Sequence, residues 1–295
     1  ANPDGPAIEI VLDMEEGEYD GGETLAPPEG IQLILAGHEG AVISSTGEPA
    51  LSVVTGEVML AGQLTLAGTG DTAVCAVSGG SLVLVGTTDL VKTIDAGAAG
   101  EVQVGMLIVE GGVQFIESST NLWCESSGAE QLGIEVVGIR MEGGSLQGRG
   151  FTAAVKAGKH VYVEKPCCVE VRGCTVDLGT ADDPGGNTFE LDGDGQFITN
   201  LGSDPISAVG NTFILNGQDI TDQSYLIEDH IHHALDEAGC GLVTYVPDNV
   251  FVTQDSGSVQ RAVDAVPPGY TVNVQALACL TPYAADGRLL TVAYQ

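Results

Sequence analysis

The chain has 295 residues, of which 9 are Lys or Arg and 41 are Asp or Glu, so its formal net charge is -32. This charge excludes a nucleic-acid-binding protein, because too few cations are present to neutralise phosphates, and it argues against docking on anionic lipid. Hydrophobic residues make up 43% of the chain, which is too many for an acidic disordered tail.

Residues 8–217 are a series of short β-rich runs separated by Gly, Asp, Ser and Thr. Runs such as 31–35 and 82–85 are rich in Ile, Leu and Val, and several others alternate between apolar and polar residues. Many runs end in a small residue and glycine, as at 35–37, 60–62 and 85–86. Because no window of 12 residues shows a helical stripe, the pattern predicts an all-β fold.

An octapeptide repeat selects among the all-β folds. The segment 186–193 (GNTFELDG) recurs in the same phase at 210–217 (GNTFILNG). An antiparallel sandwich or barrel gives no reason for this recurrence, whereas one turn of a solenoid does. We therefore predict a right-handed parallel β-helix of about eight to ten turns over residues 1–218, with Asn187 stacked under Asn211 and Phe189 under Phe213.

The pattern changes near residue 219, and residues 219–295 are predicted to form a small α+β linker or cap region. Residues 224–239 have an apolar stripe at helical spacing, with Ser224 as N-cap and Gly239 after the end. Strand-like runs follow at 242–246 and 250–252, and a second short helix is expected within 256–269, where two prolines end it. Strands resume at 270–274 and 289–293.

The segment 257–274 (GSVQRAVDAVPPGYTVNV) resembles the opening of secreted pectin-lyase-like β-helices, in which a short amphipathic helix precedes the first strand. The block from 227 to 253 resembles the linker between successive β-helical units of large bacterial surface proteins. The resemblance is specific for this C-terminal part of the chain and rests on the strand pattern alone elsewhere. It implies a segment cut from, or assembling into, a longer array.

Seven cysteines are present, and no two of them form a CxxC pair, so a zinc ribbon or thioredoxin-like motif is not indicated. They are either small buried hydrophobic residues or disulfide partners. If disulfides form, Cys240 with Cys279 is the preferred pair. The acidity and the scarcity of lysine suit a secreted, extracellular or cell-surface protein.

Two groups of residues are candidates for metal ligands. Zn²⁺ is the candidate ion for the expected helix at 224–239, since Asp229 and His233 are four residues apart on it; the full set is Asp229, His230, His232 and His233. Ca²⁺, the one cofactor considered, is the candidate ion for the acidic loops, with Asp177, Asp182, Asp183, Asp192 and Asp194 as ligands. The alternatives are a solvated polar helix face and solvated turns.

No catalytic residue is assigned. A polysaccharide lyase or glycoside hydrolase on a β-helix is the enzyme alternative, but the Arg-x-Lys motif of polygalacturonase-like sites is missing, and His38 precedes the pair Asp182 and Asp183 instead of following it. Such an enzyme would show a groove lined by Arg or Lys and by aromatic residues, and Trp123 is the only tryptophan. Ice binding by a threonine array is a third option, which the irregular spacing of Thr65, Thr87 and Thr88 disfavours.

The favoured function is that of a structural or adhesive extracellular rod, which assembles head to tail into a fibre or forms one unit of a multi-unit surface protein. Its expected partners are other copies of itself or neighbouring repeats, with surface polysaccharide as a further candidate; neither nucleic acid nor membrane insertion is expected. The C-terminal region of one unit would cover the first strand of the next. The predicted interface residues are Ile8, Ile10, Val259, Val263, Val272 and Val274. The alternative is that the C-terminal region folds back over its own β-helix.

Overall fold

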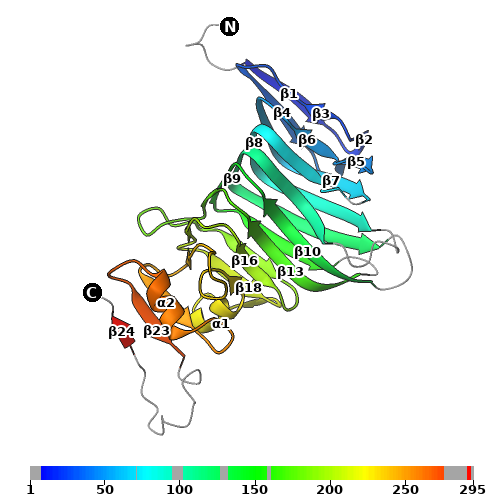
Figure 1. Ribbon diagram of the computed structural model, residues 1–295. Coiled ribbons are helices and arrows are strands. Elements are labelled where there is room, and N and C mark those ends of the chain that lie inside the picture. Colours follow the sequence, from blue (N-terminus) through cyan, green and yellow to red (C-terminus); the bar gives the residue numbers. More distant parts are fainter. Residues whose placement is uncertain are drawn as a thin grey trace.

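The computed structural model describes residues 8–70, 72–94, 102–126, 132–157, 161–275 and 291–293. The chain is mostly β, with 58% strand and 5% helix. One large sheet takes in β1 to β21, and a smaller sheet takes in β22 to β24. In Figure 1 the strands lie in rows that follow the chain from β1 at one end of the molecule towards α1, α2 and β23 at the other. None of the helices in the described part of the chain has the length and apolar character needed to span a membrane.

The strands of the large sheet form three parallel ladders, and in the described part of the chain every layer but the last, that of β21, contributes one segment to each ladder. The first ladder consists of β1 (Ile8–Met14), β4 (Ile31–Gly37), part of β7 (Glu57–Thr69), β8 (Cys75–Ile94) and β9 (Gln103–Ser126), then β11 (Ser145–Arg149), β14 (Thr175–Asp177), β17 (Ile206–Ser207) and β21 (Val243–Thr244).

The second ladder consists of β2 (Gly17–Asp20), β5 (Ala41–Thr46), the later parts of β7, β8 and β9, then β12 (Thr152–Ala157), β15 (Thr188–Leu191) and β18 (Thr212–Leu215). The short strand β19 (Gln218–Asp219) turns back and pairs antiparallel with β18. The third ladder consists of β3 (Thr24–Leu25), β6 (Leu51–Val53), the first parts of β8 and β9, then β10 (Leu132–Met141), β13 (Val161–Val171), β16 (Gln196–Asn200) and β20 (Ile231–His232).

The chain visits the three ladders in the same order throughout, and the long strands β8 and β9 each contribute to all three. The prediction of parallel strands is therefore confirmed. The octapeptide repeat brings β15 and β18 together in the expected register, with Phe189 opposite Phe213 and ring centroids 5.6 Å apart. In the layers before, Phe115 stacks on Phe151 at a centroid distance of 4.6 Å, and Phe151 meets Phe189 edge to face at 5.8 Å.

The repeated asparagines are buried and stack as expected, but they bond to the backbone rather than to each other's amides. Asn211 Oδ1 accepts the backbone N–H of Asn187 at 3.0 Å, and Asn187 Oδ1 accepts that of Phe151 at 3.2 Å. The Nδ2 groups of both asparagines donate to the carbonyl of Leu178. Each amide thus satisfies backbone groups that the turn before the strand would otherwise leave unpaired.

Glycines form a column of their own where the chain turns from the third ladder into the first. Gly80, Gly111 and Gly144 follow one another in successive layers, all with φ between +72° and +92°. A Cβ on Gly111 would lie 2.4 Å from the carbonyl oxygen of Gly80. The corner therefore requires glycine for two reasons: the backbone is left-handed, and the layers approach each other closely.

Two apolar cores fill the molecule. The larger one runs between the three ladders from Met14 to Tyr245, and the smaller one joins Leu235 and Leu242 to the strands and helix of the C-terminal region. That region contains α1 (Ser224–Asp229), β22 (Asn249–Val252), α2 (Val259–Ala265), β23 (Thr271–Val274) and β24 (Thr291–Ala293). β22 and β23 are parallel, and β24 pairs antiparallel with β23.

The helix predicted at 224–239 is wrong over most of its length. α1 ends at Asp229, and Ile231 and His232 pair with β16 instead. Ladder hydrogen bonds and the burial of Ile231 in the large core outweigh the helical spacing of the apolar residues. As a result the large sheet continues to Thr244, beyond the predicted end at residue 218. The second predicted helix is confirmed as α2, where Ser258 Oγ accepts the N–H of Arg261 at 3.2 Å.

Replacing Gly111 by Ala should lower the free energy of unfolding by about 2 to 5 kcal/mol, because the left-handed backbone and the contact with Gly80 both oppose a Cβ. Gly217→Ala is the matched control, since Gly217 has φ +73° but no atom within 4 Å of an added Cβ. Gly217→Ala should lower the free energy of unfolding by about 1 to 2 kcal/mol. Urea unfolding measures both, and equal losses would contradict the close stacking at this corner.

Replacing Phe213 by Ala should lower the free energy of unfolding by about 3 to 5 kcal/mol, because its ring is buried against Phe189, Phe197 and Tyr245. Phe213→Leu keeps most of the volume and should lower it by less than about 1.5 kcal/mol. Thermal and urea unfolding of the pair test this, and a loss below about 1 kcal/mol for Ala would contradict the aromatic column.

Candidate functional site

The end of the molecule at β1 exposes an apolar surface, which we call the β1 end face; it comprises Ile8, Ile10, Val11 and Leu12. One row of leucines shows why this surface is exposed. Leu12, Leu35, Leu60 and Leu84 occupy equivalent positions in four successive layers, and their exposed fractions are 49%, 4%, 1% and 0%. A side chain in this row becomes buried once a layer lies on each side of it, and in the described part of the chain β1 pairs with β4 alone.

The other residues of the β1 end face are similarly exposed, with fractions of 64% for Ile8, 43% for Ile10 and 55% for Val11. Behind them is a hollow of about 460 Å³, lined mainly by apolar side chains that include Leu12, Leu25 and Ile43. An exposed strand edge with apolar side chains is a template for another strand. The β1 end face is therefore the candidate interaction site of the molecule.

The structure separates the two halves of the predicted assembly interface. Ile8 and Ile10 lie on the β1 end face, as expected. Val272 and Val274 are instead buried in the small core, at 0% and 2% exposure, and Val259 and Val263 of α2 pack against the same core. The side chains of β23 therefore face their own α2 and β22, and the role of Val272 and Val274 in covering another strand edge stays a prediction.

The C-terminal region contacts the end of the stack opposite to β1. Phe251 of β22 stacks on Tyr245 at a centroid distance of 5.6 Å, and Tyr245 in turn contacts Phe213 of the large core. Arg261 of α2 donates to the carbonyl of Leu235 at 2.9 Å. This region thus covers the last layer of its own ladders.

Buried polar groups join α1 to β21 beneath this cover. Glu228 Oε1 lies 2.9 Å from His233 Nε2, and Glu228 Oε2 lies 3.1 Å from the Tyr245 hydroxyl. His233 Nδ1 accepts the N–H of Val243 at 2.9 Å, so Nε2 carries the proton and donates to Glu228. Burial raises the pKa of Glu228 and that of Tyr245. Both ring nitrogens of His233 are thus engaged, which leaves it no atom for a metal.

The predicted zinc ligands do not come together as a set. His230 is buried and its Nδ1 lies 2.7 Å from the carbonyl of Gly195. Asp229 and His233 no longer share a helix face, because α1 ends at Asp229. His232 lies apart from them on β20, where its Nε2 is 3.4 Å from Glu237 Oε2 and where Cys240 is close by.

The predicted calcium ligands are likewise dispersed. Arg149 lies between Asp177 and Asp183, and its Nη2 is 2.8 Å and 2.7 Å from their carboxylates. Partial burial tends to raise the pKa of Asp177, but hydrogen bonds from Arg149 lower it overall. The Arg149 guanidinium thus supplies, between these two carboxylates, the positive charge that a bound Ca²⁺ would supply.

The remaining three acidic residues of that set are exposed in turns: Asp182, Asp192 and Asp194. Among the described residues, the groups of three with metal-ligand spacing are His232, Glu237 and Cys240, and Asp13, Glu15 and His38, so neither contains a predicted calcium ligand.

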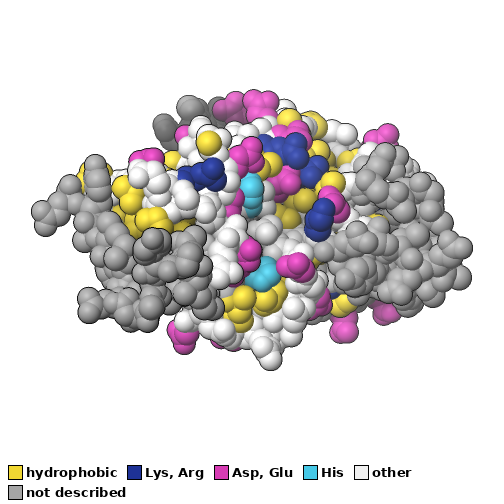
Figure 2. Space-filling model, turned by 60° about the horizontal axis from the view of Figure 1, so that its bottom comes forward, with side chains coloured by type: hydrophobic (Ala, Val, Ile, Leu, Met, Phe, Trp, Pro, Cys, Tyr) yellow, Lys and Arg dark blue, Asp and Glu magenta, His cyan; other side chains and the backbone are white. Residues whose placement is uncertain are grey.

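A polar groove of about 510 Å³ runs along the outer side of β10, β13 and β16. Its cations are paired with glutamates, since Arg140 and Arg172 both lie 2.8 Å from Glu170, and Lys165 lies 2.7 Å from Glu135. Figure 2 shows Lys and Arg side chains gathered among acidic ones on one face of the molecule. The lining of the groove contains no aromatic side chain among the described residues.

Most cysteines have the environment of buried hydrophobic residues. Burial raises the pKa of the Cys75, Cys124 and Cys167 thiols to about 12 and raises that of Cys168 further above its ordinary value. Cys240 is half-buried, and burial together with the carboxylates of Glu237 and Asp236 raises its thiol pKa. Cys279, its predicted disulfide partner, lies outside the described residues.

The chain matches no family model, no curated protein and no solved structure. The resemblance to pectin-lyase-like surface proteins therefore stays a prediction.

The buried carboxyl of Glu228 should make stability depend on pH. Because the fold raises its pKa, the folded protein retains a proton there that the unfolded chain releases, so the contribution of Glu228 falls as the pH rises above the ordinary glutamate value of roughly 4.3. Glu228→Gln removes this titration and puts an amide of similar size in place of the carboxyl group. The unfolding free energy of the wild type relative to Glu228→Gln should therefore decrease from acidic to neutral pH in urea titrations. A difference that is constant, or that rises with pH, would contradict the buried carboxyl.

Proposed function

We propose that this chain is a structural unit of an extracellular rod, in which the three ladders close into a right-handed parallel β-helix. The constant order in which the chain visits the ladders, over strands from β1 to β21, supports this closure. The corner glycines and the continuous apolar core between the ladders support it too. The net charge of -32 suits an adhesive or surface setting, where it keeps rods apart except at their ends.

The observation that carries the proposal is the loss of burial along the row from Leu84 to Leu12. Ile10 and Leu12 of the β1 end face are in the inward rows of Val58 and Leu60, and they need one further layer to be buried as those two residues are. A strand layer of the same kind fits best, because its backbone continues the parallel ladder and its apolar residues continue the rows. The layer comes from another copy of the chain or from a neighbouring unit of the same polypeptide.

The C-terminal region supports the idea of successive units. β22 and β23 are parallel, with Asn249 opposite Thr271, and α2 connects them. Asn273 Nδ2 donates to Asn249 Oδ1 at 3.0 Å, so polar residues also stack between these two layers. This arrangement has the form of a new ladder that begins after the large sheet ends.

A polysaccharide-active protein is the second candidate, and the groove along β10, β13 and β16 favours it. Arg140, Lys165 and Arg172 lie there in a chain that has only 9 basic residues. Their pairing with Glu135 and Glu170, and a described lining without aromatic side chains, make the groove a weaker argument than the β1 end face.

Ile10→Lys should prevent end-to-end association, because it places a charge in the β1 end face. Ile116→Lys is the matched control, since Ile116 is 40% exposed in the middle of β9, away from either end. The wild type and the control should form linear oligomers at high protein concentration and in high salt, which screens the charge. Ile10→Lys should raise the protein concentration needed for oligomers to form by at least about tenfold, which corresponds to a change of roughly 1.4 kcal/mol in the free energy of association. Sedimentation velocity and electron microscopy measure this, and a wild type that stays monomeric under all these conditions would overturn end-to-end association between copies of this chain.

A further inference from the structure

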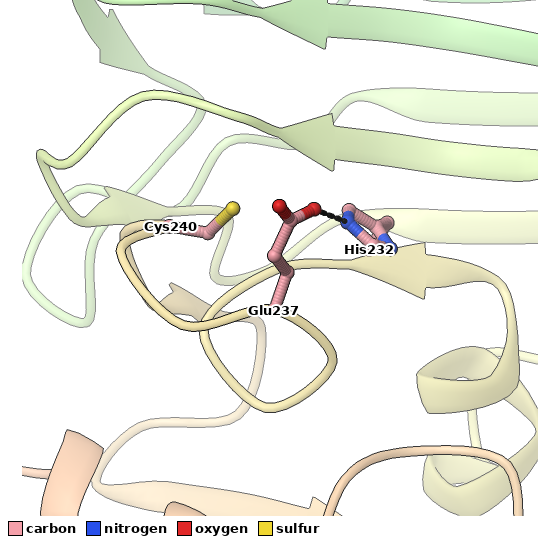
Figure 3. A group of neighbouring side chains, drawn as sticks. All are labelled: His232, Glu237 and Cys240. Carbon is pink, nitrogen blue, oxygen red and sulfur yellow. Dashed lines mark hydrogen bonds and ion pairs between the residues drawn. The ribbon is translucent and has the colours of Figure 1, made fainter.

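We propose that His232, Glu237 and Cys240 form a Zn²⁺ site. The site is independent of the rod function and lies at the opposite end of the stack from β1. Figure 3 shows the three side chains pointing into one space between strand β20 and the loop that follows it. One ligand atom from each of the three residues lies within 4.8 Å of the others.

The spacing of these atoms suits a tetrahedral zinc ion. Zinc binds nitrogen and oxygen at about 2.0 to 2.2 Å and sulfur at about 2.3 Å, so neighbouring ligand atoms in a tetrahedron lie roughly 3.3 to 3.7 Å apart. His232 Nε2 and Glu237 Oε2 are 3.4 Å apart, which is long for a hydrogen bond but within this range. A small movement of the Cys240 side chain completes the set.

The backbone around the site is already fixed, so little ordering is needed on binding. Asp236 Oδ2 accepts the N–H of His233 at 2.9 Å, and the N–H of Glu237 donates to the carbonyl of His233 at 3.0 Å. At the far end of the loop, the N–H of Gly241 donates to the carbonyl of Gly202 at 2.6 Å. β20 and the loop are thus both held to the large sheet while the three side chains point outward.

The ligand types select zinc over calcium. An imidazole nitrogen and a thiolate suit Zn²⁺, whereas Ca²⁺ takes oxygen ligands. A thiolate and a carboxylate together balance the two charges of the ion. Three protein ligands leave a fourth position for water or another small ligand. The other group with suitable spacing, Asp13, Glu15 and His38, is exposed and has no sulfur, and it provides a control.

Zinc binding also competes with the predicted disulfide, because Cys240 cannot ligate zinc and pair with Cys279 at the same time. The number of free thiols therefore bears directly on the proposal. Cys240 should react with an alkylating reagent in the metal-free chain and should be protected by Zn²⁺.

The test uses the full chain and titrates it with Zn²⁺ against a chromogenic chelator, and with Co²⁺ to observe the thiolate-to-metal charge-transfer band. Cys240→Ser and His232→Asn should weaken zinc binding by about 100-fold or more, since loss of mere outer-shell partners already weakens it roughly 10- to 100-fold. Cys240→Ser should also abolish the charge-transfer band. Cys174→Ser, which changes another half-buried cysteine, and His38→Asn, which disrupts the other group, should leave the affinity unchanged.

Three results would overturn the proposal: no zinc binding by the wild type, an affinity unchanged in Cys240→Ser, or an affinity lost in His38→Asn. A chain purified without reductant in which Cys240 is found entirely in a disulfide would overturn it as well. Melting curves of the metal-free variants, which should match the wild type, separate a loss of zinc from a loss of fold.

Discussion

Each layer of the large sheet hydrogen-bonds the layer before it with equivalent residues opposite each other, so an inward side chain is covered only when a layer lies on both of its sides. The row from Leu12 to Leu84 shows this directly. The same constraint explains the pair Phe189 and Phe213 and the column of glycines, because equivalent residues of neighbouring layers lie opposite each other. Stability in such a stack comes from contacts between neighbouring layers, so the two ends differ from everything between them.

The two ends of this molecule meet the constraint differently. At the end after β21, the C-terminal region covers the last layer through Phe251, Tyr245 and the buried Glu228–His233 pair. At the β1 end the described residues provide no such cover, and four apolar side chains are exposed.

Much of the fold could be predicted from the sequence, because the strand runs and the octapeptide at 186–193 and 210–217 repeat in phase with the layers. The helix expected at 224–239 failed for a reason that spacing cannot reveal: Ile231 and Leu235 are apolar in a helical pattern, yet hydrogen bonds of the third ladder take Ile231 into β20. The prediction of the zinc site failed for the same reason, because it relied on the helix expected at 224–239. Asp229 and His233 would share a face only if the helix continued, and α1 ends at Asp229. His232, Glu237 and Cys240 lie close together because the chain turns back after β20. The spacing H-x₄-E-x₂-C was visible in the sequence, but nothing in it distinguishes a turn from a helix.

The in-register stacking of layers is tested most directly by distances between spin labels on one outward row. Gln63, Thr152 and Thr212 belong to such a row in the second ladder, with Thr87 and Ser119 between the first two and Thr188 between the last two. At roughly 4.8 Å per layer, the distance from position 63 to position 212 should exceed that from 63 to 152 by about 10 Å, because two further layers intervene. Pulsed electron paramagnetic resonance on chains labelled through unnatural amino acids would show this increment if the account is correct. Two equal distances, or a shorter distance to position 212, would contradict it.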